Sequence, residues 1–210
     1  MLCQGTSIRA SSRRWAKKFL YPKLEAQQEK PSVSGYRYGA GLGLSFASLF
    51  EKDYGNGLRL SGNFCYKLAE RLSLELTIQT YRVNVKANSQ ALSEGKLSMF
   101  PIQLSLRGHF PLKNNFTPYV FCGLGYYLNN FSSRAITIPE LDEEVNNSLE
   151  LHFGGGVDYF FHKNIALNAD LRFCLVKTSV SVTYLGELIG TIGNINLSSF
   201  MLGIGVKYFF

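Results

Sequence analysis

The sequence predicts an all-β protein, an eight-stranded antiparallel up-and-down transmembrane β-barrel. From residue 36 to the end of the 210-residue chain, apolar residues alternate with polar or small residues in eight separate runs. A period of two is typical of strands that have one apolar face. The runs exceed the usual globular strand length and match the ~9–11 residues that a tilted strand needs to cross a bilayer.

The first four runs alternate regularly. Their ranges and main apolar positions are 36–49 with Leu42, Leu44 and Phe46; 58–69 with Leu58, Leu60 and Phe64; 71–84 with Leu72, Leu74 and Leu76; and 97–110 with Ile102, Leu104 and Leu106. Between these positions stand glycines, serines and charged residues. Each run therefore predicts a strand with one apolar and one polar face.

The last four runs repeat this pattern. They are 116–130 with Val120, Cys122 and Leu124; 149–162 with Leu149, Leu151 and Phe153; 165–178 with Leu167, Leu171 and Phe173; and 197–210 with Leu202, Ile204 and Val206. The fifth run is less regular, because Tyr119 and Phe121 stand between its apolar positions. Glycines on the polar faces leave room for large neighbours and let a sheet curl into closure.

The connections between the runs alternate strictly in length. The short ones are Ala69-Glu70, Pro111–Asn115 and Lys163-Asn164, and the long ones are 50–57, 85–96, 131–148 and 179–196. Outer-membrane barrels have short periplasmic turns and longer outer loops. An even number of strands then places both chain ends in the periplasm.

The distribution of charge indicates which face meets lipid. Across the eight apolar faces the only charged residues are Arg82 and Lys177, and both lie at the loop end of their run. A charge at the bilayer midplane costs ~2–4 kcal/mol and much less at the interface. This favours a barrel with its apolar face outward over a soluble lipocalin-like barrel with that face inward. We expect an integral Gram-negative outer-membrane protein with Arg82 and Lys177 facing lipopolysaccharide.

The net charge of +7 is concentrated at the N-terminus. Residues 1–30 hold seven of the 22 Lys and Arg residues but only two of the 15 Asp and Glu residues. We interpret residues 1–34 as a disordered basic leader or a defective or misassigned signal region, and residues 35–210 as the barrel. Because the barrel itself is nearly neutral, the charge does not predict a nucleic-acid partner.

Several motifs in residues 97–210 resemble the outer-membrane protein W family. They are Gly155-Gly156-Val157-Asp158-Tyr159-Phe160, Leu167-Asn168-Ala169-Asp170-Leu171-Arg172-Phe173, Gly203-Ile204-Gly205-Val206-Lys207-Tyr208-Phe209-Phe210, and the hairpin around Phe100-Pro101 and Pro118-Tyr119-Val120. The resemblance implies an eight-stranded barrel associated with the passage or binding of small hydrophobic molecules. It also implies that barrel-assembly machinery reads the last strand, with Tyr208 and Phe210 as the signal.

The polar faces predict a network inside the barrel. Buried charges must be paired, and six charged residues fall at similar depths when counted from the short-turn end: Glu75, Arg107, Asp158, Asp170, Arg172 and Lys207. We expect them to form an ion-pair and hydrogen-bond network that plugs a lumen only wide enough for side chains. The alternative is a proton or solute pathway.

Two function classes remain open. One is a porin-like porter or binder of small hydrophobic molecules, in which Phe121, Tyr127 and His152 line an apolar cavity of the upper lumen. The other is a structural or adhesive surface protein with a plugged lumen. It would recognise partners through its long loops, of which 179–196 is predicted to be a projecting β-hairpin.

No motif predicts catalysis. His109, His152 and His162 lie on different predicted strands, and the four cysteines form no C-x-x-C pair. We therefore expect no enzyme activity, no catalytic residue, no metal and no cofactor. The expected partners of this monomer are outer-membrane lipid, lipopolysaccharide and the assembly machinery.

Overall fold

The computed structural model describes residues 36–51, 56–85, 95–112, 115–133, 141–184 and 187–210. All of these belong to Pro31–Phe210, the second of the two units into which the chain divides. The predicted leader, residues 1–34, lies outside the described residues. Within the described residues, no helix has the length and apolarity required to span a membrane.

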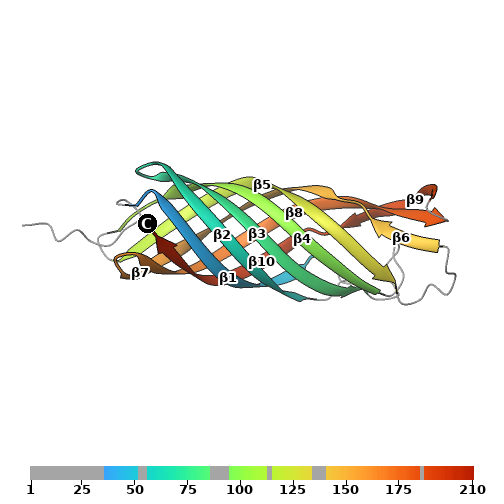
Figure 1. Ribbon diagram of the computed structural model, residues 1–210, viewed down its shortest axis with the longest axis horizontal. Helices are drawn as coiled ribbons and strands as arrows, with labels where there is room; N and C mark the ends of the chain where they lie inside the picture. The colour runs from blue at the N-terminus through green and yellow to red at the C-terminus, as the bar shows by residue number, and fades with distance from the viewer. Residues whose placement is uncertain (1–35, 52–55, 86–94, 113–114, 134–140, 185–186) are drawn as a thin grey trace, which may run out of the picture. The chain divides into compact units, whose positions relative to one another are not determined.

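Eight antiparallel strands close into a barrel (Figure 1). The strands of the described residues are β1 (Tyr38–Leu49), β2 (Gly57–Ala69), β3 (Leu72–Val85), β4 (Gly95–His109), β5 (Phe116–Ser133), β6 (Leu141–Val145), β7 (Ser148–His162), β8 (Ile165–Tyr184), β9 (Glu187–Asn196) and β10 (Ser199–Phe209). Around the barrel each strand pairs with the next in the order β1, β2, β3, β4, β5, β7, β8, β10, and β10 pairs with β1. The predicted eight-stranded barrel is confirmed.

The side chains of the barrel strands alternate between an outward and an inward face. The outward positions hold leucines and aromatic residues that are strongly exposed, such as Leu42 at 70% and Leu149 at 75%. The inward positions hold buried polar residues, among them Arg59, Arg107 and Glu150. An apolar outer surface around a polar interior suits a barrel that is surrounded by lipid.

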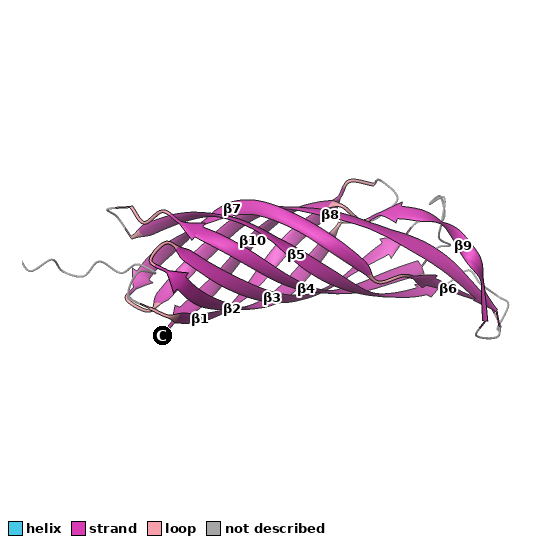
Figure 2. Cartoon of the chain, turned by 90° about the horizontal axis from the view of Figure 1, so that it is seen from above, coloured by secondary structure: helices cyan, strands magenta, loops and turns pink. Residues whose placement is uncertain are grey.

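A small sheet extends beyond the loop end of the barrel (Figure 2). The second half of β8 pairs with β6 on one edge, where Val145 lies opposite Val180, and with β9 on the other, where Lys177 lies opposite Asn196. The β8–β9 hairpin was predicted from the alternation in 179–196. The pairing of β6 was not predicted, because Leu-Asp-Glu-Glu-Val does not alternate like the barrel strands.

The barrel interior is filled in layers. Nearest the short turns, Phe160, Ala166 and Phe209 pack together with Tyr36. Two polar clusters follow, and the loop half contains an apolar cluster of buried residues: Ala47, Leu49, Tyr81, Val83, Leu97, Met99, Tyr127, Val145, Cys174, Val176, Val180, Ile195, Leu197 and Met201. Side chains of this size fill an eight-stranded barrel.

Candidate functional site

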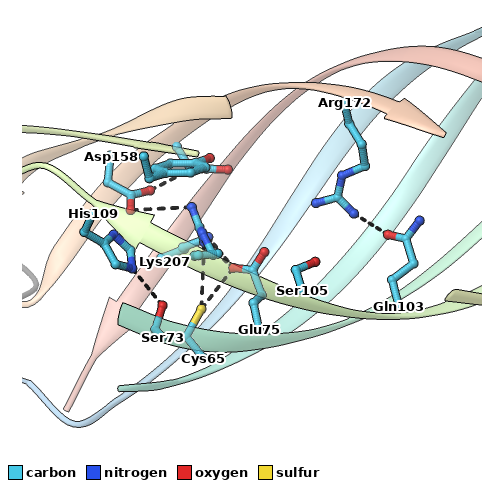
Figure 3. Close-up of polar contacts among 12 residues, drawn as sticks. Cys65, Ser73, Glu75, Gln103, Ser105, His109, Asp158, Arg172 and Lys207 are labelled. Carbon is cyan, nitrogen blue, oxygen red and sulfur yellow. Dashed lines mark hydrogen bonds and ion pairs between the residues drawn. The ribbon is translucent and has the colours of Figure 1, made fainter. Parts of the chain in front are cut away.

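The first polar cluster is centred on the carboxylate of Glu75. Lys207 Nζ donates to Glu75 Oε2 at 2.6 Å, Arg107 pairs with the same oxygen, and the Cys65 thiol donates to it at 2.9 Å. Arg107 Nη2 also lies 3.8 Å from Asp158 Oδ2, and the guanidinium group stacks on the ring of Tyr119. Figure 3 shows Lys207, Cys65 and Glu75 side by side. Two buried cations therefore share Glu75, and Asp158 supplies a second negative charge.

Gly41 makes room for this cluster. A Cβ atom at this position would lie 2.8 Å from Lys207 Cγ and 2.9 Å from Asn63 Oδ1. Real Cβ atoms do not approach other heavy atoms so closely, so Lys207 could not reach Glu75 unchanged beside a larger residue. The glycine on the polar face of β1 thus positions an ion pair that spans the lumen.

The second polar cluster lies nearer the loops and is built on amides. Gln103 Nε2 donates to both carboxylate oxygens of Glu150, at 2.7 and 2.8 Å, and Gln103 Oε1 accepts from Arg172. Figure 3 draws the Arg172–Gln103 contact to one side of the Glu75 cluster. Nearer still to the loops, the Arg59 guanidinium donates to Gln79 Oε1 at 3.3 Å and to the Tyr127 hydroxyl at 3.2 Å. These hydrogen bonds join six of the barrel strands, β2, β3, β4, β5, β7 and β8.

The structure places the six predicted network residues in three settings. Glu75, Arg107, Asp158 and Lys207 lie together. Arg172 belongs to the second cluster instead, and Asp170 lines a polar void of ≈ 30 Å³. Arg59, Gln103 and Glu150 were missed, although their inward parity was visible in the sequence. Depth counted along each strand does not reveal which residues meet across a barrel of tilted strands.

Ser105, His152 and Glu150 are arranged like a serine hydrolase triad. Ser105 Oγ lies 2.8 Å from His152 Nε2, and His152 Nδ1 lies 3.0 Å from Glu150 Oε1. All three residues are at most 1% exposed. A Cβ at Gly123 would overlap the Leu104 carbonyl oxygen and lie 2.7 Å from His152 Nε2, so the packing is tight. Because Ser105 and His152 are completely buried, no substrate reaches Ser105 in this structure, and the three side chains fill the lumen at this level.

The three residues expected to line a ligand cavity are packed among other side chains of the lumen. Tyr127 accepts a hydrogen bond from Arg59, the guanidinium of Arg172 lies 4.7 Å from the ring of Phe121, and His152 contacts Ser105. Each is at most 5% exposed. The nearby polar void has space for about two water molecules, and the unpaired Thr77 Oγ1 and Asn63 Oδ1 give such water hydrogen-bonding partners.

Both predicted rim cations point outward and are exposed. Arg82 is on β3 and Lys177 is on β8, four strands apart in the eight-stranded order, so they stand on opposite walls. Lys96 on β4 is also exposed, and it lies diagonally across from Arg82, because Ser98 is the partner of Arg82 and Asn84 is the partner of Lys96. Lys96 was not predicted to be a rim cation, because it falls just before the predicted fourth run.

Aromatic rings form a band at the short-turn end. The ring of Tyr38 lies 5.4 Å from that of Tyr66 and 6.0 Å from that of Phe210, and Tyr208 and Phe210 are 6.1 Å apart. Tyr208 and Phe210 are 51% and 54% exposed. These positions suit a membrane interface, where aromatic rings are enriched.

Changing Tyr208 and Phe210 together to Ser is expected to lower insertion in cells several-fold while changing stability in detergent less. We expect this because the resemblance implies that assembly machinery reads the last strand before β10 pairs with β1 and protects its edge. Insertion is measured as heat-modifiable protein in outer-membrane fractions, and stability by denaturant unfolding of refolded protein. The double change of Tyr159 and Phe161 to Ser, at the same end of β7, is the control. An equal loss of insertion in that control would mean that these aromatics serve only as band residues.

Comparisons with known proteins agree with this architecture. Residues 24–210 match the family described as outer membrane protein beta-barrel domain. No curated protein matches the sequence. Among solved structures, outer membrane protein AlkL in DMPC lipid bilayers has 20% identity and a TM-score of 0.61, with 90% of this chain and 95% of that chain covered.

Two further structures have the same fold. Outer membrane protein W of E. coli has 16% identity and a TM-score of 0.57, covering 85% of this chain and all (100%) of that one. Neisserial surface protein A has 18% identity and a TM-score of 0.56, covering 84% and 98%. These likenesses support the predicted resemblance to the outer-membrane protein W family at the level of a small eight-stranded outer-membrane barrel.

Proposed function

The chain belongs to the outer membrane protein beta-barrel domain family, and on that premise we propose that this integral protein of the bacterial outer membrane has a closed lumen and acts through its outer surface. The observation that carries the proposal is the filled interior. Two polar clusters and one apolar cluster follow one another along the lumen, with Arg59, Arg107 and Tyr127 completely or almost completely buried. The role is recognition or adhesion at the loop end.

The extension of β8 supports the same function. With β6 and β9 it forms a sheet that continues past the barrel, on the side of the long connections. In outer-membrane barrels the long connections are extracellular. This orientation presents the small sheet outside the cell and places the start of β1 and Phe210 in the periplasm. Exposed strand edges of such a sheet can pair with an extended segment of a partner.

The filled lumen leads to a direct expectation about conductance. The refolded protein in a planar bilayer should show no stepwise current that scales with salt concentration, because buried charged and aromatic side chains fill the lumen apart from a polar void of ≈ 30 Å³. A general porin inserted in the same membrane provides the positive control. Reproducible open-channel steps of the purified barrel would contradict the closed lumen.

One observation favours a second function, the passage of small hydrophobic molecules. The loop half of the lumen is apolar, and its methionines Met99 and Met201 are flexible side chains that can repack around a ligand. We test this with decane added to the protein in nanodiscs, following the methyl resonances of Met99 and Met201. A closed lumen predicts no saturable shift. A saturable shift of these two methyl groups would favour passage instead.

A further inference from the structure

A hollow of ≈ 850 Å³ lies on the outer rim, where β8 leaves the barrel. At this point the partners of β8 change on both edges: its pairing with β7 ends at Val176, its pairing with β10 ends at Cys174, and its pairing with β9 begins at Lys177. Six outward residues that line the hollow determine its chemistry: Tyr126, Leu149, Lys177, Ser179, Asn194 and Asn196. They come from four strands, β5, β7, β8 and β9.

The lining is ordered from apolar to polar along the barrel. On the barrel side, Tyr126 and Leu149 are register partners, and Leu149 is 75% exposed. On the loop side, Ser179 and Asn194 are register partners that offer a hydroxyl and an amide. Lys177 stands at the boundary. The hollow therefore repeats, over a short distance, the change from hydrocarbon to water at a membrane surface.

The cation of this hollow is available to a ligand. Lys177 forms no ion pair with any of the residues that the structure describes, and its side chain is exposed. Among the described residues that line the hollow, the one carboxylate is Glu51, which accepts a hydrogen bond from the Asn196 backbone N–H at 3.2 Å. That bond holds Glu51 beside Asn196.

Hydrogen bonds hold the walls of the hollow in place. Asn129 Nδ2 donates to the Asn146 carbonyl at 2.8 Å, and Asn146 Nδ2 donates to Ser179 Oγ at 2.8 Å. Thr178 Oγ1 donates to the same Asn146 carbonyl at 2.6 Å. These bonds attach the junction between β6 and β7 to the edge of β8, so the hollow exists before a ligand arrives.

We propose that this hollow binds the phosphorylated saccharide headgroup of an outer-leaflet lipid. Lys177 contacts a phosphate, Ser179, Asn194 and Asn196 bind sugar hydroxyls, and Leu149 and Tyr126 pack on the first carbons of an acyl chain. Only a lipid presents these three chemistries in this order at this depth. The proposal rests on the membrane orientation given under the proposed function, but not on a closed lumen, so the conductance result leaves it unaffected.

The test measures lipid binding to the full chain in phosphatidylcholine nanodiscs, with lipid A as the probe. Lys177→Gln should weaken lipid A binding about tenfold, because a hydrogen bond to a charged group is worth ~1.5–3 kcal/mol. Lys177→Arg should keep the affinity within about twofold, since it keeps the charge. Glu51→Gln should leave the affinity equal or raise it, because it removes a negative charge beside the phosphate.

Arg82→Gln is the matched control, because it removes the same charge from the opposite wall of the rim. It should leave the affinity within about twofold of the unchanged protein. An equal loss in Arg82→Gln and Lys177→Gln would assign binding to the general charge of the rim and overturn the site. Heat-modifiable mobility of each variant verifies that the barrel has folded.

The ligand class is tested by three further probes. Dephosphorylated lipid A should bind about tenfold more weakly and should no longer distinguish Lys177→Gln from the unchanged protein. Inorganic phosphate should not displace lipid A, and phosphatidylglycerol should bind more weakly than lipid A. Displacement by phosphate would reveal a simple anion site, and equal binding of phosphatidylglycerol would remove the role given to the sugar hydroxyls. Either result would overturn the proposal.

Discussion

Glu75→Gln is expected to destabilise the barrel by ~3–5 kcal/mol, the cost of breaking a buried ion pair by removing one partner. The carboxylate pairs with both Arg107 and Lys207, whose side chains are 1% and 3% exposed. After the substitution the two cations share no carboxylate, and among the described residues the ion pair left to Arg107 is the one with Asp158, at 3.8 Å. The measurement is reversible urea unfolding in lipid vesicles.

Two companion variants distinguish the loss of charge balance from general damage. Adding Lys207→Met to Glu75→Gln removes one of the stranded cations and should restore part of the lost stability. Asp170→Asn removes a half-buried carboxylate that forms no ion pair with the described residues, and it should cost less than about 1 kcal/mol. A loss below about 1 kcal/mol for Glu75→Gln itself would refute the central role of this carboxylate.

The sequence allowed the strands and their two faces to be predicted because lipid imposes a strict rule on every second residue. An outward-facing charge is costly at mid-membrane depth and is tolerated only near the rim, so each strand carries the pattern in its own residues. Even the irregular fifth run follows it, since Tyr119 and Phe121 both point inward, where guanidinium groups lie over their rings. The guanidinium over each ring comes from another strand, Arg107 on β4 for Tyr119 and Arg172 on β8 for Phe121.

The contacts inside the lumen were much less predictable, because they join residues with no local relation. Glu75 and Lys207 are 132 positions apart and meet from β3 and β10. The depth at which two inward residues meet depends on the stagger of all strands between them. For this reason, depth counted along single strands grouped Arg172 with Glu75, whereas the structure joins Arg172 to Gln103 and adds Arg59 as a fourth buried cation beside Arg107, Lys207 and Arg172.

The hollow at the rim depends on two further features that local patterns do not show. The pairing of β6 with β8 brings Asn146 beside Ser179, and β9 brings Asn194 to the other side. Lys177 itself was recognised as a rim cation, because a charge on an apolar face is conspicuous in a sequence. The residues that line the hollow with Lys177 could be identified only from the strand order.

Leu171→Arg is expected to cost ~2–4 kcal/mol in bilayers, and Leu175→Arg less, because the penalty for a charge falls towards the interface. Both side chains point outward from β8, at 44% and 45% exposure, and Lys177 shows that the next outward position carries a cation naturally. Strand, face and substitution are the same, so depth is the main difference between the two variants. Leu104→Arg on β4, also outward and near mid-strand, should match Leu171→Arg.

An arginine introduced on the inward face should respond differently to the surroundings of the barrel. Ser45→Arg would place a long cation against a void of only ≈ 30 Å³ that is lined by Lys207 and Arg172. We therefore expect it to destabilise the barrel through overpacking and charge repulsion, whether the surroundings are lipid or detergent. The cost of Leu171→Arg should instead shrink when the thickness of the bilayer is reduced, because a snorkelling arginine then reaches the interface more easily. A cost of Leu171→Arg that is independent of bilayer thickness would contradict its assignment to the lipid face.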